Sequence, residues 1–99
     1  MTSRPRRVLV KKQVIDFVAT QSPEARHRLR LAIRGLAQER GDIKALEGDL
    51  VGLHRLRVGV YRVVIAYEQG GTTIQCIFAE HRSVVYMMME QMLRDRMAE

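Results

Sequence analysis

The sequence of 99 residues has one cysteine, two prolines and no tryptophan. A lone thiol, Cys76, excludes an internal disulfide and a cysteine metal cluster, and it fits a reducing compartment. The longest apolar run, Val84–Met89, is far shorter than the ~20 residues that cross a bilayer. No basic and apolar leader opens the chain. These absences predict a single cytoplasmic domain over residues 1–99 that does not associate with membranes.

Positive charge is abundant. Seventeen Lys and Arg residues stand against eleven Asp and Glu, which gives a net charge of +6 and a pI near 10.2. Fourteen of the cations are arginine, whose planar guanidinium forms paired hydrogen bonds with phosphate or carboxylate. The segment Arg4–Lys12 is cationic and has no acid. The composition favours an anionic partner such as nucleic acid.

The first half of the chain has helical periodicity. Residues 7–10 are β-prone, and apolar residues at helical spacing then predict a helix over residues 11–19. Ser22 and Pro23 are typical of a helix start, and Gly41 of a helix end. The two helices predict a helical hairpin with one buried face, and residues 42–52 are expected to form a connection.

The second half changes to a period of two. The runs Leu53–Val58, Val60–Tyr67 and Thr72–Glu80 are rich in β-branched and aromatic residues. Tight turns at Val58-Gly59 and Gly70-Gly71 predict an antiparallel meander. The expected fold class is therefore α+β, with the helical hairpin packed on a small twisted antiparallel sheet and a short C-terminal helix beginning at Ser83.

With these turns the sheet has one apolar face and one cationic face. The apolar face carries Leu56, Tyr61, Val63, Ile65, Tyr67, Ile74, Cys76 and Phe78, with His54 and Glu80 at its ends. The other face carries Arg55, Arg57, Arg62, Val64, Ala66, Gln75, Ile77, Ala79 and His81. On it Arg55 lies opposite Arg62, an arrangement that like charges disfavour. Either an acid such as Glu47 or Asp49 neutralises these cations, or an external anion does, and we favour the external anion.

The C-terminal helix contains four of the six methionines, between Met87 and Met92. We expect these flexible side chains to fill gaps in the core, and an adaptable docking surface is the alternative.

Two segments resemble a known family. The run Leu53–Val64 (LHRLRVGVYRVV) resembles the central hairpin of RelE/ParE-superfamily toxins, and His81–Tyr86 (HRSVVY) is similar to their C-terminal signature. The resemblance covers nearly the whole chain and implies the RelE-like fold and a toxin of a type II toxin–antitoxin system, with functions in translation inhibition and plasmid stabilization. A RelE-like member is an mRNA interferase, a metal-independent endoribonuclease that cleaves ribosome-bound mRNA. A ParE-like member inhibits DNA gyrase by binding, and a detoxified member is a third reading, because one cationic position of the family falls on Leu53.

The resemblance also implies functional residues and partners. Arg55 and Arg62 would stabilise charge on a phosphate, His81 would transfer a proton at its ordinary pKa of ~6.5, and Tyr86 would stack on a base or act as an acid. Further RNA-binding candidates are Arg57, Arg82, Lys11 and Lys12. We expect no metal and no cofactor, since His27, His54 and His81 occur on three different elements. The expected partners are a small acidic cognate antitoxin, the ribosome and mRNA, or DNA gyrase in the alternative.

Overall fold

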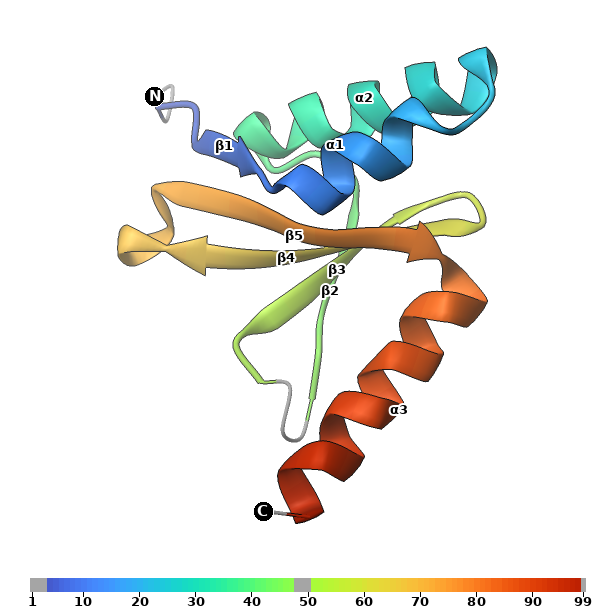
Figure 1. Ribbon diagram of the computed structural model, residues 1–99. Helices are drawn as coiled ribbons and strands as arrows, with labels where there is room; N and C mark the ends of the chain where they lie inside the picture. Colours follow the sequence, from blue (N-terminus) through green and yellow to red (C-terminus); the bar gives the residue numbers. More distant parts are fainter. Residues whose placement is uncertain (1–3, 48–50, 99) are drawn as a thin grey trace.

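The computed structural model describes residues 4–47 and 51–98, which form an α+β fold with a five-stranded mixed sheet (Figure 1). The strand order is β1-β5-β4-β3-β2. The elements are β1 (Arg7–Val10), α1 (Lys12–Ala19), α2 (Pro23–Gly35), the 3₁₀ turn η1 (Leu36–Gln38), β2 (Asp42–Ala45), β3 (Leu53–Val58), β4 (Tyr61–Glu68), the 3₁₀ turn η3 (Gln69–Gly71), β5 (Thr73–His81) and α3 (Arg82–Ala98).

Helices α1 and α2 lie on one face of the sheet (Figure 1). The predicted start of α2 is confirmed, because the Ser22 hydroxyl accepts a hydrogen bond from the Ala25 N–H at 3.3 Å and Pro23 is the first helical residue. The helix ends at Gly35, earlier than predicted, and a 3₁₀ turn carries the chain to Glu39 at a φ of 55°. The helices and the sheet face beneath them form one core of Val14, Val18, Leu29, Ile33, Leu36, Leu56, Val58, Val63, Ile65, Ile74, Cys76 and Ala79.

The sheet is larger than the predicted meander and is not wholly antiparallel. Strand β1 pairs in parallel with β5, beginning with Arg7 beside Thr73. Residues Asp42–Ala45, predicted as a connection, form the edge strand β2 antiparallel to β3. Of these four residues only Ile43 packs against the core. The strand is therefore defined by its backbone partners in β3, which residue periodicity does not report.

The first hairpin differs from the prediction by one residue in its turn. Val58 pairs with Tyr61, so the two-residue turn is Gly59-Val60, with Gly59 at a φ of 60° in its first position. A positive φ at that position suits glycine and gives a twist that matches antiparallel strands. The shift changes the cross-strand partners, so that Arg57 lies opposite Arg62 and Arg55 lies opposite Val64.

A β-bulge in β5 changes which side chains share a face. Ile65 pairs with Cys76 as predicted, but Val64 pairs with Phe78, which leaves Ile77 as an extra residue. One extra residue reverses the alternation beyond it. Phe78 therefore leaves the core face on which it was expected, and Ala79 is buried there beside Val63.

The end of β5 is held by a side chain from α1. The Gln13 side chain donates to the carbonyl of Ala79 and accepts from its N–H, both at 2.8 Å. Strand β1 pairs with β5 only as far as Cys76. The Gln13 amide thus pairs with the backbone of β5 where the neighbouring strand has ended, which satisfies a buried donor and acceptor.

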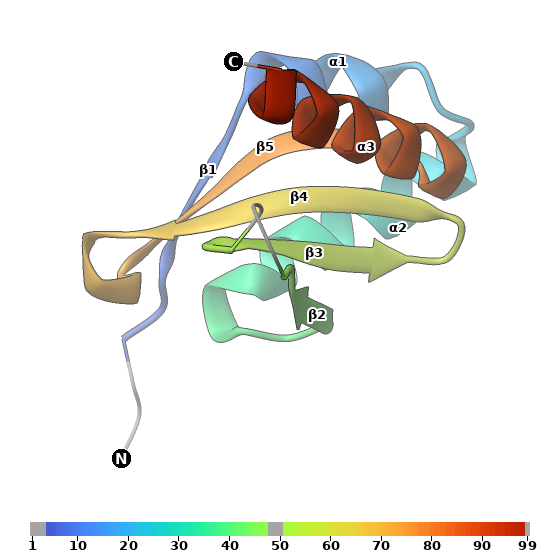
Figure 2. The ribbon, with the colours of Figure 1, turned by 90° about the horizontal axis from the view of Figure 1, so that it is seen from below.

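Helix α3 lies on the opposite face of the sheet from α1 and α2 (Figures 1 and 2). It begins at Arg82 and spans 17 residues, so it is longer than the short helix expected. Val85 is buried, whereas Met87 and Met88 are exposed, and the prediction that the methionines fill the core is wrong for these two. Within residues 4–47 and 51–98, no helix is both long enough and apolar enough to span a membrane.

Candidate functional site

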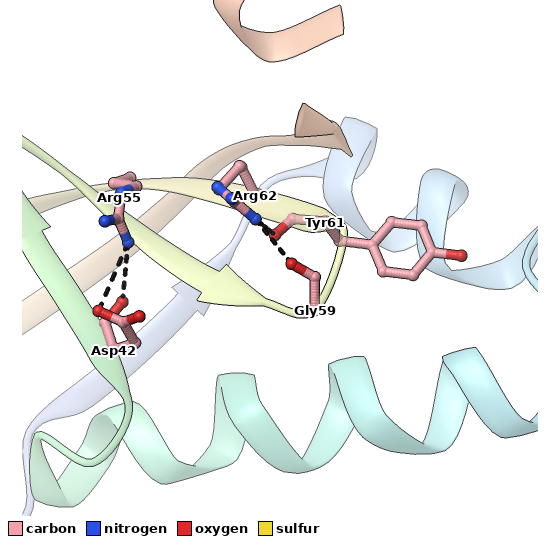
Figure 3. A network of polar contacts seen from close by, with 5 residues as sticks. All are labelled: Asp42, Arg55, Gly59, Tyr61 and Arg62. Carbon is pink, nitrogen blue, oxygen red and sulfur yellow. Dashed lines mark hydrogen bonds and ion pairs between the residues drawn. The ribbon is translucent and has the colours of Figure 1, made fainter. Parts of the chain in front are cut away.

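Arg62 is almost fully buried in the β3–β4 hairpin, with 5% of its surface exposed. Its Nη1 donates to the carbonyls of Gly59 and Tyr61 at 2.8 and 2.9 Å (Figure 3). Its Nε has no hydrogen-bond partner among the described residues. The turn therefore fixes the position of the guanidinium group and leaves part of its donor capacity unused.

Arg55 is held by an acid on the neighbouring edge strand. Its Nη1 lies 3.6 Å from the Asp42 carboxylate and 3.4 Å from the Asp42 carbonyl oxygen (Figure 3). The sequence suggested Glu47 or Asp49 as a partner, and Asp49 lies outside the described residues. Asp42 was missed because the sequence did not show that residues 42–45 pair with β3, which brings Asp42 beside Arg55. The oxygens of Asp42 orient Arg55 from one side. At most two of the five guanidinium N–H donors are engaged, so the others are free to bind an anion.

Three arginines share the face of the sheet on which α3 lies. Arg55 and Arg57 alternate along β3, and Arg62 lies directly opposite Arg57 on β4. Arg57 is exposed and has no ion-pair partner among the described residues. Like charges directly opposite one another on a sheet are destabilising. This arrangement forms a cationic face that an external anion would stabilise. We call Arg55, Arg57 and Arg62 the arginine cluster.

Tyr86 comes from the second turn of α3 and meets this cluster. The neighbouring Arg62 guanidinium lowers the pKa of Tyr86 below the ordinary value of 10, the positive charges of Arg55 and Arg57 lower it further, and partial burial opposes the shift. The side chain is 47% exposed. A tyrosine with a lowered pKa beside three cations loses its proton more readily than a free phenol. The structure therefore brings together Arg55, Arg62 and Tyr86 from the predicted catalytic set, and Arg57 with them.

His81 does not lie on the face predicted for it. Its backbone pairs with Tyr61, whereas Glu80 is the residue opposite Arg62. The expectation that His81 shares the face of Arg62 is wrong, because the bulge at Ile77 reverses the alternation over the end of β5. The ring is exposed, and its Nδ1 lies 2.9 Å from the Ser83 hydroxyl. The sequence could not have corrected this prediction, because nothing in the run Thr72–Glu80 shows where the extra residue of the bulge lies.

The other predicted RNA-binding residues are scattered. Arg82 begins α3, and its backbone N–H donates to the Val60 carbonyl at 2.8 Å, which places it beside the β3–β4 turn. Lys11 and Lys12 lie at the start of α1, across the sheet from α3 (Figure 1). Lys12 pairs with Asp16 at 2.5 Å. These two lysines are therefore not brought to the arginine cluster.

An apolar cavity of about 200 Å³ lies between α3 and the sheet. Val64 and Phe78 line it from the sheet, and Val85 and Met88 line it from the helix. Leu53 also lines this cavity. The face that carries the arginine cluster thus continues into an apolar patch under α3. Among residues 4–47 and 51–98, no three His, Cys, Asp or Glu side chains are grouped as metal ligands would be.

Solved structures that share this architecture include toxin–antitoxin complexes. The chain is similar to the archaeal RelE–RelB complex from Pyrococcus horikoshii, with 26% identity, a TM-score of 0.65, and coverage of 79% of this chain and 96% of that chain. It is similar to the RelB–RelE antitoxin–toxin complex from Methanococcus jannaschii, with 26% identity, a TM-score of 0.62, and coverage of 79% and 94%. The toxin–antitoxin complex RelBE2 from Mycobacterium tuberculosis, at 23% identity and a TM-score of 0.65 over 79% of this chain and 99% of that chain, shares the fold.

No protein-family model matches the chain, and no curated protein sequence matches it. The likeness to these solved structures is one of fold over 79% of this chain. By its fold, the chain is similar to toxins of the RelE/ParE superfamily.

Proposed function

We propose that residues 1–99 are the toxin domain of a type II toxin–antitoxin pair that cleaves ribosome-bound mRNA in the cytoplasm, and that Arg55, Arg62 and Tyr86 carry the reaction. One observation supports this proposal above the others. The Tyr86 hydroxyl has a lowered pKa and lies against the arginine cluster. A proton acceptor on the same face as several guanidinium groups suits RNA self-cleavage, which needs a base and positive charge near the phosphate.

The reaction is the attack of a ribose 2′-oxygen on the adjacent phosphorus. Tyr86, as the phenolate, removes the 2′-hydroxyl proton, and the new P–O bond gives a five-coordinate phosphorane with added negative charge. Arg62 and Arg55 stabilise that charge, because each guanidinium matches two phosphate oxygens and stays protonated. The bond to the 5′-oxygen then breaks, which leaves a 2′,3′-cyclic phosphate and a 5′-hydroxyl.

Arg62 is suited to this role by its rigidity. The carbonyls of Gly59 and Tyr61 hold Nη1, so the charge is in place before the phosphate arrives. A group that is already oriented needs no reorganisation in the transition state. Arg57 is exposed on the same face and binds a flanking phosphate.

The departing 5′-oxygen needs a proton. The exposed ring of His81 lies at the end of β5, on the face away from Arg62, so His81 is tested as the proton donor rather than placed at the cluster. Arg82 holds the RNA backbone beside it. Lys11 and Lys12 lie across the sheet and contact more distant phosphates of the ribosome-bound message.

The partner that silences the toxin is an antitoxin protein. The proposal is supported by the solved relatives from Pyrococcus horikoshii and Methanococcus jannaschii, which are complexes of RelE with RelB. The net charge of +6 favours an acidic partner, and complementary charge speeds association.

The test is cleavage of a defined mRNA on translating ribosomes, followed by primer extension and analysis of the product ends. Tyr86→Phe removes only the hydroxyl and is expected to lower the cleavage rate by about 10²–10⁴-fold. Arg62→Lys keeps the charge but not the fork and is expected to lower it by about 10²-fold or more. The matched controls are Tyr67→Phe, on the opposite face, and Arg40→Lys, on the exposed end of the helical region, and both are expected to cleave normally.

The cleavage rate of His81→Ala tests whether His81 protonates the departing 5′-oxygen. A message with one 2′-deoxynucleotide at the cleaved position lacks the attacking hydroxyl and must resist cleavage. If Tyr86→Phe and Arg62→Lys cleave at the wild-type rate, the assigned site is wrong. A DNA gyrase supercoiling assay is carried out in parallel with the mRNA cleavage assay. Arrested supercoiling with intact mRNA would replace the ribonuclease proposal with gyrase inhibition, and inactivity in both assays would indicate a detoxified member.

A further inference from the structure

The β3–β4 turn is a point where arginine residues of different elements meet. Arg62 on β4 donates to the carbonyls of Gly59 and Tyr61 at 2.8 and 2.9 Å. The carbonyl between them, that of Val60, accepts from the backbone N–H of Arg82 at 2.8 Å. Arg82 is the first residue of α3. Two arginines thus contact three successive carbonyls of the turn.

A third arginine reaches the same turn from α2. The Nη2 atom of Arg28 lies 2.8 Å from the position that a Cβ atom on Gly59 would occupy, and its Cζ lies 3.6 Å from that position. Any side chain at residue 59 would force this guanidinium group to move. Figure 3 shows Gly59 on the side of the hairpin toward α2. The absence of a side chain at Gly59 therefore lets Arg28 rest against the turn.

The charge of Arg28 is not neutralised by the chain. Arg28 is exposed and has no ion-pair partner among residues 4–47 and 51–98, and the same is true of Arg82. Glu24 lies four residues before Arg28 on α2, a spacing at which opposite charges often pair on a helix. Arg28 does not pair with Glu24 and extends to the turn instead. Such a cation is available to an external anion.

We propose that Arg28 and Arg82 bind phosphates on the two sides of the turn, so that a single-stranded RNA passes from the arginine cluster around the hairpin tip to α2. The cluster leads to the tip, because Arg57 lies two residues before Gly59 on β3. Helices α2 and α3 lie on opposite faces of the sheet (Figure 2), so the strand would cross from one face to the other there. The inference takes its ligand, RNA, from the proposed function and adds a contact outside the reacting face.

An acidic protein segment fits the tip less well than RNA does. A docked helix or strand of a protein covers apolar side chains as well as charges. The turn offers one large exposed apolar side chain, Val60, which is 44% exposed. Phosphates need only hydrogen-bond donors and positive charge, and the guanidinium groups of Arg28 and Arg82 supply both.

The probe is a fluorescein-labelled 2′-O-methyl oligonucleotide of about ten uridines, which binds without being cleaved. Fluorescence anisotropy gives the logarithm of the binding constant against the logarithm of the salt concentration, and each phosphate contact on a single strand adds about 0.7 to the steepness of that line. Arg28→Ala and Arg82→Ala are each expected to reduce the steepness by about 0.7. Each should also weaken binding about three- to fivefold at low salt. The matched control is Arg30→Ala, because Arg30 is also exposed on α2 but two residues further along, on a different side of the helix; it should leave both values unchanged.

Gly59→Ala tests the contact between Arg28 and the turn. Because the added Cβ displaces the Arg28 guanidinium group, its effect on oligonucleotide binding should be smaller in Arg28→Ala than in the wild type. Equal effects of Gly59→Ala in the two backgrounds would overturn the inference.

Three other results would also overturn it. The first is an Arg28→Ala line as steep as that of the wild type, and the second is an equal loss in Arg30→Ala. The third is that Arg28→Ala weakens binding of a labelled glutamate-rich peptide but not of the oligonucleotide, which would assign the tip to a protein partner. Normal mRNA cleavage by Tyr86→Phe would instead refute the proposed reaction and leave the oligonucleotide result standing.

Discussion

The contact between Gln13 and Ala79 gives a quantitative test of how β5 is held. Gln13→Ala removes two hydrogen bonds of 2.8 Å to the backbone of a residue with no exposed surface. Each bond is worth about 1 kcal/mol net, and an unsatisfied buried backbone group costs about 1–3 kcal/mol. An open depression lined by Lys12, Asp16 and Glu80 adjoins Gln13. Water can enter there, so we expect the low end of the range, a loss of about 2 kcal/mol.

The measurement is the free energy of unfolding from urea titration, supported by thermal unfolding. For a chain of this size, a loss of about 2 kcal/mol lowers Tm by about 8–16 °C. The control is Lys12→Ala on the neighbouring residue, whose side chain is 88% exposed and whose effect should stay within about 0.5 kcal/mol. If Gln13→Ala and Lys12→Ala unfold at the same urea concentration, the Gln13 amide does not hold the end of β5.

Gln13→Glu adds a dependence on pH whose sign is fixed by the geometry. The introduced carboxylate can accept from the Ala79 N–H but faces the Ala79 carbonyl oxygen without a proton to donate. Its folded-state pKa is therefore raised above the ordinary ~4.3 of glutamic acid. Its stabilising contribution is present below the unfolded pKa and is lost as pH rises through the folded pKa. The variant should approach the wild type below about pH 4 and fall furthest behind it at neutral pH.

Two further results are expected. The Tyr86 hydroxyl should titrate below the ordinary pKa of tyrosine, because Arg62, Arg55 and Arg57 lower its pKa. The cleavage rate should therefore rise with pH over the neutral and mildly alkaline range. Arg62→Ala should raise the pKa of Tyr86, which ultraviolet absorbance can follow. Gly59→Ala should lower the free energy of unfolding by about 1 kcal/mol because Gly59 has a φ of 60°; an unchanged unfolding midpoint would mean that the turn tolerates another conformation.

Part of the fold could be predicted because it depends on neighbours in the sequence. Helix α2 begins where Ser22 and Pro23 indicate, since a capping hydroxyl and a proline act within one turn. Strand β3 has the predicted bounds, Leu53–Val58, because β-branched residues and the following glycine define it locally. The arginines of β3 and β4 were correctly assigned to one face of the sheet. The turn lies one residue later than predicted but still has two residues, so it changes the cross-strand partners without moving a side chain to the other face.

The remainder depended on partners distant in the chain. The bulge at Ile77 lies on the side of the sheet that faces α3, where Ile77 and Phe78 line one cavity with Val85. That extra residue moved His81 away from the face of Arg62. The ion pair of Arg55 with Asp42 required a strand that forms only by pairing with β3.

The sequence by itself therefore determined the helices α1 and α2, the three long strands and the residue types of the cationic face. Tertiary structure alone decided that Tyr86, rather than His81, meets the arginine cluster, and that Arg28 of α2 reaches the β3–β4 turn. The physical reason is that the face a side chain occupies depends on a count of residues along a strand, and a single inserted residue, whose free energy is set by distant packing, reverses that count.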